Sequence, residues 1–237
     1  MTDLLLGFST GVFKDETLSV YDRLREFAKV ACSIIELGFV QIHRFEKFDP
    51  EERPQEFVDL LAQYKYVSLH APKCTYDKTA ETAKVFEKIN KVHKLRQLDL
   101  VIFHPDTIVD FELFNNLPFP VAFENMDKRK TFGRTVEDIQ NVLAKNPTFK
   151  MVLDVNHVFT NDPTMKLAED FLASLGDRIA EIHLSGYTKL HDPIYISKQD
   201  FIAKPIINLE KPIIVESDLD PSEVELEKNY IRSLLRN

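Results

Sequence analysis

Eight short apolar runs recur along the chain, and they constrain its fold more than any other feature. The runs cover residues 4–9, 33–37, 66–70, 100–104, 121–124, 151–154, 179–183 and 212–216. Each is rich in β-branched or aromatic residues, and each is continuous rather than alternating between apolar and polar positions. A strand that is covered on both faces reads this way, because neither face meets water. The runs therefore predict eight buried strands.

Segments with helical periodicity separate the runs. The stretches 21–31, 54–64, 79–95 and 135–145 each place apolar residues on one stripe. Thr135 and Asp138 have the spacing of a capping box. In a further helix, Asp162 is predicted as the cap, Pro163 as the first helical residue and Gly176 as the residue just past the end. Strands that alternate with helices indicate a parallel sheet.

Eight such units close naturally into a (β/α)8 TIM barrel, the α/β fold that we predict. The connection between the fourth and fifth strands leaves room for only a short helix, near residues 111–117. A doubly wound open sheet is the alternative, but no GxGxxG motif follows the first strand. No Gly/Ser linker divides the chain, so one domain is expected over residues 1–237.

Composition narrows the classes of partner and compartment. The net charge of −8 argues against a large nucleic-acid interface, which needs a basic face. No apolar run is long enough for a membrane span, and the first residues, MTDLLLGFSTG, lack the basic region of a secretory signal. Cys32 and Cys74 make neither a disulfide framework nor a CxxC site. We expect a cytoplasmic protein without a membrane partner, and nothing in the sequence indicates an oligomeric state.

Ionisable residues finish the third to eighth runs. In chain order these residues are His70, His104, Glu124, Asp154, His183 and Glu216. The carboxyl ends of barrel strands meet at one face, so these side chains should converge. Carboxylates that lie close together repel each other, and a divalent cation removes that cost. A lone histidine is more often a satisfied core residue and a lone aspartate more often a helix cap, but the joint pattern favours a metal site.

The type of metal follows from the ligand types. Imidazole together with carboxylate suits Zn, Mn, Fe or Co better than Ca. We expect one or two divalent ions, with Zn or Mn preferred. His157, three residues after Asp154, is a further candidate ligand.

The order of these strand-end motifs resembles the xylose isomerase-like TIM-barrel superfamily. The motifs SLHAPK, IFHPD, FENMD, LDVNH, IHLSG and VES carry the resemblance, which runs from the first strand to the last. This superfamily contains sugar and sugar-phosphate isomerases and epimerases, and also zinc-dependent apurinic-site endonucleases. The resemblance implies a metal held by Glu124, Asp154, His183 and Glu216.

The endonuclease branch implies further metal positions. A second would use His70 and His104, with Glu124 as a bridge. A third would use His157, His191 and an aspartate two residues before His191. That place is Lys189 here, which cannot be a ligand, so a third metal is not expected. Asp192 is the nearest alternative carboxylate, although nothing in the sequence assigns it.

Three function hypotheses remain. The first is a metal-dependent isomerase or epimerase of carbohydrate metabolism that acts on a small sugar, sugar phosphate or polyol. Glu124 and Glu216 resemble its proton-transfer pair, against the alternative that both are ligands only. The second is a dinuclear phosphoester hydrolase, which His70 and His104 favour. The third is a non-catalytic metal-binding barrel.

The candidate substrate contacts lie near the same strand ends. The loop MDKRKTFGR supplies Lys128, Arg129, Lys130 and Arg134, which could anchor a phosphate or carboxylate; a solvated loop is the alternative. Glu36, Lys73 and Asn125 are further candidates. The expected partner is a small carbohydrate or phosphorylated molecule.

Overall fold

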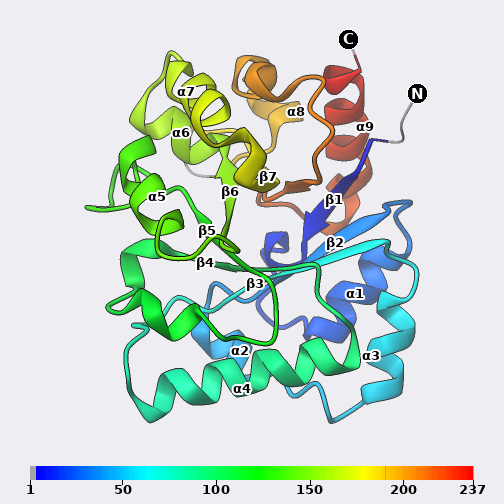
Figure 1. The fold of residues 1–237 in the computed structure, drawn as a ribbon. Coiled ribbons are helices and arrows are strands. Elements are labelled where there is room, and N and C mark those ends of the chain that lie inside the picture. Colours follow the sequence, from blue (N-terminus) through cyan, green and yellow to red (C-terminus); the bar gives the residue numbers. More distant parts are fainter. Residues whose placement is uncertain (1–3, 190, 237) are drawn as a thin grey trace.

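Eight parallel strands close into a barrel in chain order in the computed structural model, which describes residues 4–189 and 191–236 (Figure 1). β1 pairs with both β2 and β8, which closes the sheet. The predicted (β/α)8 fold is thereby confirmed, while the extent of one domain over residues 1–237 stays a prediction. The strands are β1 (Leu6–Ser9), β2 (Ile34–Gly38), β3 (Tyr66–His70), β4 (Leu100–Phe103), β5 (Val121–Glu124), β6 (Lys150–Asp154), β7 (Ile179–Leu184) and β8 (Ile213–Val215).

Helices surround the barrel (Figure 1). The predicted capping box is confirmed, since Thr135 and Asp138 bond each other's backbone N–H groups at the start of α5. Among the described residues, no helix is long and apolar enough to cross a membrane. The α-helices are α1 (Val20–Ala28), α2 (Ile42–Lys47), α3 (Pro54–Leu61), α4 (Ala80–Leu95), α5 (Val136–Leu143), α6 (Val155–Asn161), α7 (Lys166–Leu175), α8 (Ile194–Ser197) and α9 (Val224–Leu235).

The segment after β6 differs from the prediction. Asp162 does not begin a helix with Pro163: it ends α6, and α7 begins only after Met165, whose φ is 63°. The Asp162 carboxylate still accepts the N–H groups of Thr164 and Leu167, so it stabilises the turn between the two helices. The predicted end at Gly176 is correct.

The connection between β4 and β5 is as short as predicted. It holds two 3-10 turns, η2 (Pro105–Thr107) and η3 (Phe111–Phe114), the second lying within the helix expected at 111–117. Inside the barrel, Leu100, Ile102, Ala122 and Val152 form a small apolar cluster. Side chains alternate along a strand, so Glu124 and Asp154, two residues beyond Ala122 and Val152, face the same interior at the barrel mouth.

Candidate active site

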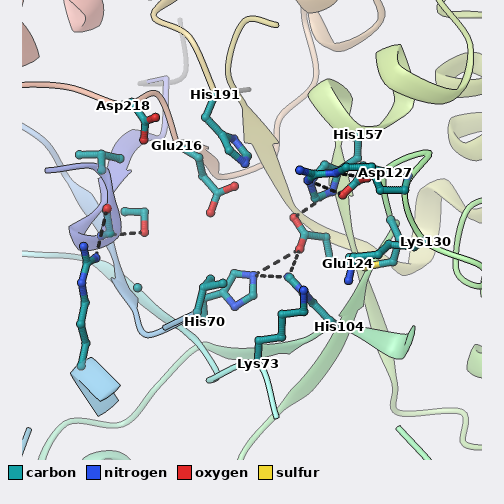
Figure 2. Close-up of a pocket in the computed structure, with 18 residues that line it drawn as sticks. His70, Lys73, His104, Glu124, Asp127, Lys130, His157, His191, Glu216 and Asp218 are labelled. Atoms are coloured by element: carbon teal, nitrogen blue, oxygen red, sulfur yellow. Dashed lines mark hydrogen bonds and ion pairs between the residues drawn. The ribbon is translucent and has the colours of Figure 1, made fainter. Parts of the chain in front are cut away.

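A cavity of about 250 Å³ opens where the strands end. Its lining brings together residues from almost every strand end, as barrel topology predicts (Figure 2). Of the predicted ligands, six line this cavity directly, and Asp154 and His183 lie behind them. The six are His70, His104, Glu124, His157, His191 and Glu216.

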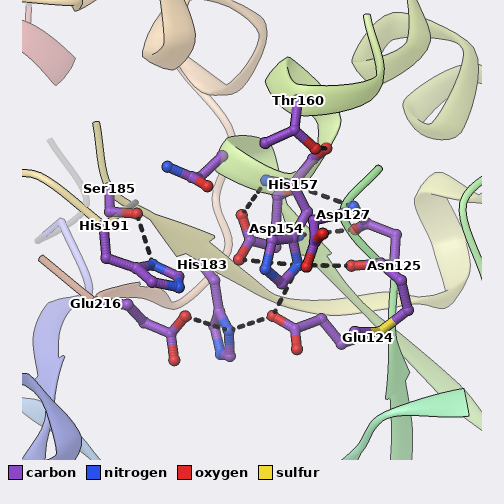
Figure 3. A network of polar contacts seen from close by, with 12 residues as sticks. Glu124, Asn125, Asp127, Asp154, His157, Thr160, His183, Ser185, His191 and Glu216 are labelled. Atoms are coloured by element: carbon purple, nitrogen blue, oxygen red, sulfur yellow. Dashed lines mark hydrogen bonds and ion pairs between the residues drawn. The ribbon is translucent and has the colours of Figure 1, made fainter. Parts of the chain in front are cut away.

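The first ligand group is made of Glu124, Asp154, His183 and Glu216. One ligand atom from each lies within 4.8 Å of all the others. His183 Nδ1 is 2.9 Å from Glu124 Oε1 and 3.4 Å from Glu216 Oε2 (Figure 3). Glu124, Asp154 and His183 are buried, and the Glu216 side chain is 14% exposed. Three carboxylates and an imidazole thus share one small volume.

Asp154 has one carboxylate oxygen left for a ligand. Its Oδ1 accepts the N–H of His157 at 2.8 Å and so caps α6. Asn125 fixes the backbone, because its Nδ2 donates to the Asp154 carbonyl at 2.9 Å and its Oδ1 accepts the Asp154 N–H at 2.8 Å. Oδ2 is buried and lies 3.3 Å from His157 Nδ1, but it accepts no hydrogen bond from the described residues, because that ring nitrogen donates to the Asn125 carbonyl. A buried carboxylate oxygen without a donor, aimed into a group of imidazole and carboxylate ligands, fits a divalent cation.

A second group surrounds the other oxygen of Glu124. Glu124 Oε2 lies 3.3 Å from His70 Nε2 and 3.0 Å from His104 Nε2, and the two ring nitrogens are 3.2 Å apart. Glu124 therefore faces His183 with one oxygen and the His70–His104 pair with the other. This is an arrangement in which one carboxylate could bridge two metal positions.

The remaining two histidines lie close to each other but have different partners. The rings of His157 and His191 are 6.0 Å apart. His157 Nδ1 donates to the Asn125 carbonyl at 2.8 Å, and His191 Nδ1 lies 3.1 Å from Ser185 Oγ. Lys189 is exposed, and the Asp192 carboxylate accepts backbone N–H groups of its own loop.

Two buried glutamates lie behind His183. His183 Nε2 is 3.0 Å from Glu181 Oε1 and 3.2 Å from Glu36 Oε2, and all three side chains are fully buried. Glu36, predicted to contact substrate, does not line the cavity. Glu181 is missed by the sequence analysis, although a glutamate inside an apolar strand is a visible signal. A carboxylate on the far nitrogen of a histidine fixes which nitrogen faces a metal.

The buried carboxylates around His183 leave this group with an excess of negative charge. Burial, with help from Glu124 and Glu216, raises the pKa of Asp154 to about 7. Burial alone would lower the pKa of His183, but Glu216, Glu36 and Glu124 outweigh it and hold that pKa well above its usual range. Without a metal, the imidazole would therefore take up a proton in place of the cation.

The predicted substrate contacts separate into two sets. Lys73 and Arg129 line the cavity. Lys128 instead lies over the Tyr187 ring, Arg134 donates to Asn161 Oδ1, and Asn125 is buried behind the site. Lys130 of the predicted loop also lines the cavity. Three further wall residues, which no strand-end pattern marks, are not among the predicted contacts: Arg44, Asp127 and Asp218.

Comparison with solved structures identifies the fold. A xylose isomerase domain-containing protein from Salmonella typhimurium LT2 superposes with a TM-score of 0.71 at 15% identity, over 98% of this chain and 97% of that chain. Endonuclease IV from Thermus thermophilus gives 0.66 at 15% identity, over 98% of each chain. D-psicose 3-epimerase from Clostridium cellulolyticum H10 gives 0.65 at 10% identity, over 98% of this chain and 99% of that chain.

No family model matches the sequence, and no curated protein matches it. The chain shares its fold with these three proteins.

Proposed function

We propose that this xylose isomerase-like barrel is a metal-dependent isomerase or epimerase of a small sugar, sugar phosphate or polyol. The observation that carries the proposal is the pair of carboxylates Glu124 and Glu216, which flank His183 Nδ1 at 2.9 and 3.4 Å and line the same cavity. A proton can then be removed from a substrate carbon by one carboxylate and returned by the same or the other one. The epimerase among the solved structures of this fold supports the reaction class.

Glu124, Asp154, His183 and Glu216 would hold a divalent metal, with Zn or Mn preferred. When bound there, the metal would polarise a substrate carbonyl and so acidify the neighbouring C–H bond. Without the metal, both proposed bases are ionised at neutral pH. Burial raises the pKa of Glu216, but His183 outweighs it and brings that pKa to about 2. Burial is likewise outweighed at Glu124, whose pKa is held well below its usual range by His157, His104 and His183.

Neighbouring residues fix the other two members of the ligand group, Asp154 and His183. Asn125 fixes the backbone of Asp154, and Glu181 holds the far nitrogen of His183.

The reaction is redox-neutral: a C–H bond breaks, its electron pair moves into an enediol, and a C–H bond forms again on the same or the neighbouring carbon. The cavity volume of about 250 Å³ suits a small molecule.

A dinuclear phosphoester hydrolase is the second candidate. The convergence of His70 and His104 on Glu124 Oε2 favours it, and endonuclease IV has the same fold. Nucleic acid is not the partner that we propose, because the chain carries a net charge of −8 and Asp127 and Asp218 lie in the cavity wall.

A non-catalytic metal-binding barrel is the third candidate. Both cysteines are free, which agrees with a cytoplasmic location.

Exchange of carbon-bound hydrogen with solvent deuterium tests the proposal. The panel contains ketoses, their phosphates and inosose-like polyols. Glu124→Gln and Glu216→Gln each keep an oxygen but remove the base, so turnover should fall by about 10²- to 10⁴-fold while much of the metal is retained. The exposed Glu87→Gln on α4 is the matched control and should change nothing. Hydrolysis of a phosphate ester, with no exchange across the panel, would replace the isomerase by the hydrolase.

A further inference from the structure

Two lysines meet at one wall of the cavity. Lys73 follows β3 and Lys130 lies in the loop after β5, and both line the cavity beside His104 (Figure 2). Lys130 Nζ is 2.5 Å from Asp106 Oδ2. Contact with Lys130, together with burial, lowers the pKa of Lys73, and Asp106 opposes that effect. Two ammonium groups thus share one carboxylate, which leaves one positive charge in excess.

The backbones that carry the two lysines are fixed. The N–H of Met126 donates to the carbonyl of Gly133 at 2.8 Å and closes the loop that contains Lys130. Gly133 has a φ of +81°, and a Cβ there would lie 2.7 Å from Pro105 Cγ, so the loop packs directly on the end of β4. The N–H of Lys73 donates to the Val40 carbonyl at 2.9 Å. The two lysines are therefore carried by loops whose backbones are held by hydrogen bonds and packing.

The other charges of the cavity are balanced or negative. Arg129 makes two hydrogen bonds to Asp127, at 2.7 and 2.9 Å, and Arg44 is paired with Glu16. The wall formed after β8 carries Glu216 and Asp218, which would repel an anion. The excess positive charge is thus confined to the side of the cavity that holds the two lysines.

We propose that Lys73 and Lys130 form a phosphate-binding subsite, so that the substrate of this barrel is a phosphate monoester rather than a neutral sugar. The inference rests on the proposed function for its use of the site. A phosphate monoester carries close to two negative charges and three acceptor oxygens, which match two ammonium groups. A phosphate held there leaves the carbon chain of the ligand to extend toward Glu124 and Glu216.

Inorganic phosphate is the probe for the subsite. Its affinity for the metal-loaded protein is measured by isothermal titration calorimetry, next to acetate as the carboxylate probe. Lys73→Gln and Lys130→Gln should each weaken phosphate binding about tenfold or more, since each removes a charge-assisted hydrogen bond. Lys128→Gln, in the same loop but placed over Tyr187, should bind as the wild type does. Lys73 is exposed, so loss of binding in its variant is not loss of fold.

The outcomes separate the subsite from the proposed reaction. Phosphate binding that is absent from the wild type, unchanged in both lysine variants, or matched by acetate overturns the subsite. Solvent exchange into a free ketose as fast as into its phosphate also overturns the subsite and leaves the isomerase intact. Lysine-dependent phosphate binding, with no exchange into any substrate, upholds the subsite and overturns the isomerase.

Discussion

Replacing Asp154 by Asn separates the two tasks of this buried side chain. Oδ1 caps α6 through the N–H of His157, whereas Oδ2 accepts no hydrogen bond from the described residues and is the oxygen that we assign to the metal. Asn keeps an oxygen for the cap and loses the charged ligand. Asp154→Ala loses both, so it should be about 1 kcal/mol less stable than Asp154→Asn without metal.

The charge of Asp154 should have opposite effects on stability in the presence and in the absence of the metal. With free metal at about a hundred times its Kd, the wild type gains about 2.7 kcal/mol in free energy of unfolding, and Asp154→Asn should gain almost none. Without metal, the pKa of Asp154 rises from 3.8 to about 7 on folding, chiefly through burial. A raised carboxyl pKa means that the folded state holds its proton more tightly, so stability is lost as pH rises through this range and stays low above it. The loss is at most about 4 kcal/mol, and Asp154→Asn escapes it.

Urea unfolding at about pH 8, in EDTA and in excess ZnCl2, measures all four free energies. We expect the variant to be the more stable protein in EDTA, and its advantage to shrink by about 2.7 kcal/mol in zinc, because only the wild type gains from the metal. A variant that gains as much from zinc as the wild type, or that is less stable than the wild type in EDTA, would contradict the assignment of Oδ2.

Further predictions concern the surroundings of the site. Glu181→Gln should weaken metal binding about 10- to 100-fold while keeping the melting temperature near that of the wild type, because Glu181 orients His183; competition with a chromogenic chelator measures the affinity. Metal affinity should fall as pH is lowered from about 8 to about 6, and metal binding should release protons. The reason is that the pKa of His183 without metal lies well above its usual value, whereas a histidine ligand must be neutral. Calorimetry in buffers of different ionisation enthalpy detects the released protons. Gly133→Ala should cost about 1–3 kcal/mol in urea unfolding, since φ is +81° and Pro105 blocks the Cβ, whereas Gly176→Ala, with nothing within 4 Å of its Cβ, should cost far less.

The barrel could be predicted because its signal is local and repeated. Each strand is a continuous apolar run, and the observed strand bounds differ from the predicted runs by at most two residues at either end. No helix is predicted over α6, because it follows β6 without a turn and Asp154 both ends the strand and caps the helix. The start at Asp162 was wrong because a carboxylate that accepts N–H groups in a turn has the same sequence signature as one that caps a helix.

The convergence of the predicted ligands also follows from topology, because parallel strands bring their carboxyl ends to one face. How deep a side chain lies inside the barrel cannot be predicted from its closeness to the end of a strand in the sequence. Glu36 pairs in register with Ser68, two residues before His70 ends its own strand, so Glu36 lies one layer deeper than the cavity. The direction of loop side chains is set by tertiary contacts. Lys130 enters the cavity and Lys128, two residues earlier, does not, because Gly133 and Pro105 fix the loop.

Metal-dependent proton exchange at a substrate carbon tests the central claim most directly. The protein is incubated in D2O with ketose phosphates, free ketoses and polyols, and proton NMR follows the loss of carbon-bound hydrogen before chelation, after chelation and after Zn or Mn is returned. We predict exchange that disappears with the metal, returns with it, and is absent in Glu216→Gln. Exchange that persists in the chelated protein, or no exchange into any member of the panel while a phosphate ester is hydrolysed, would contradict the account.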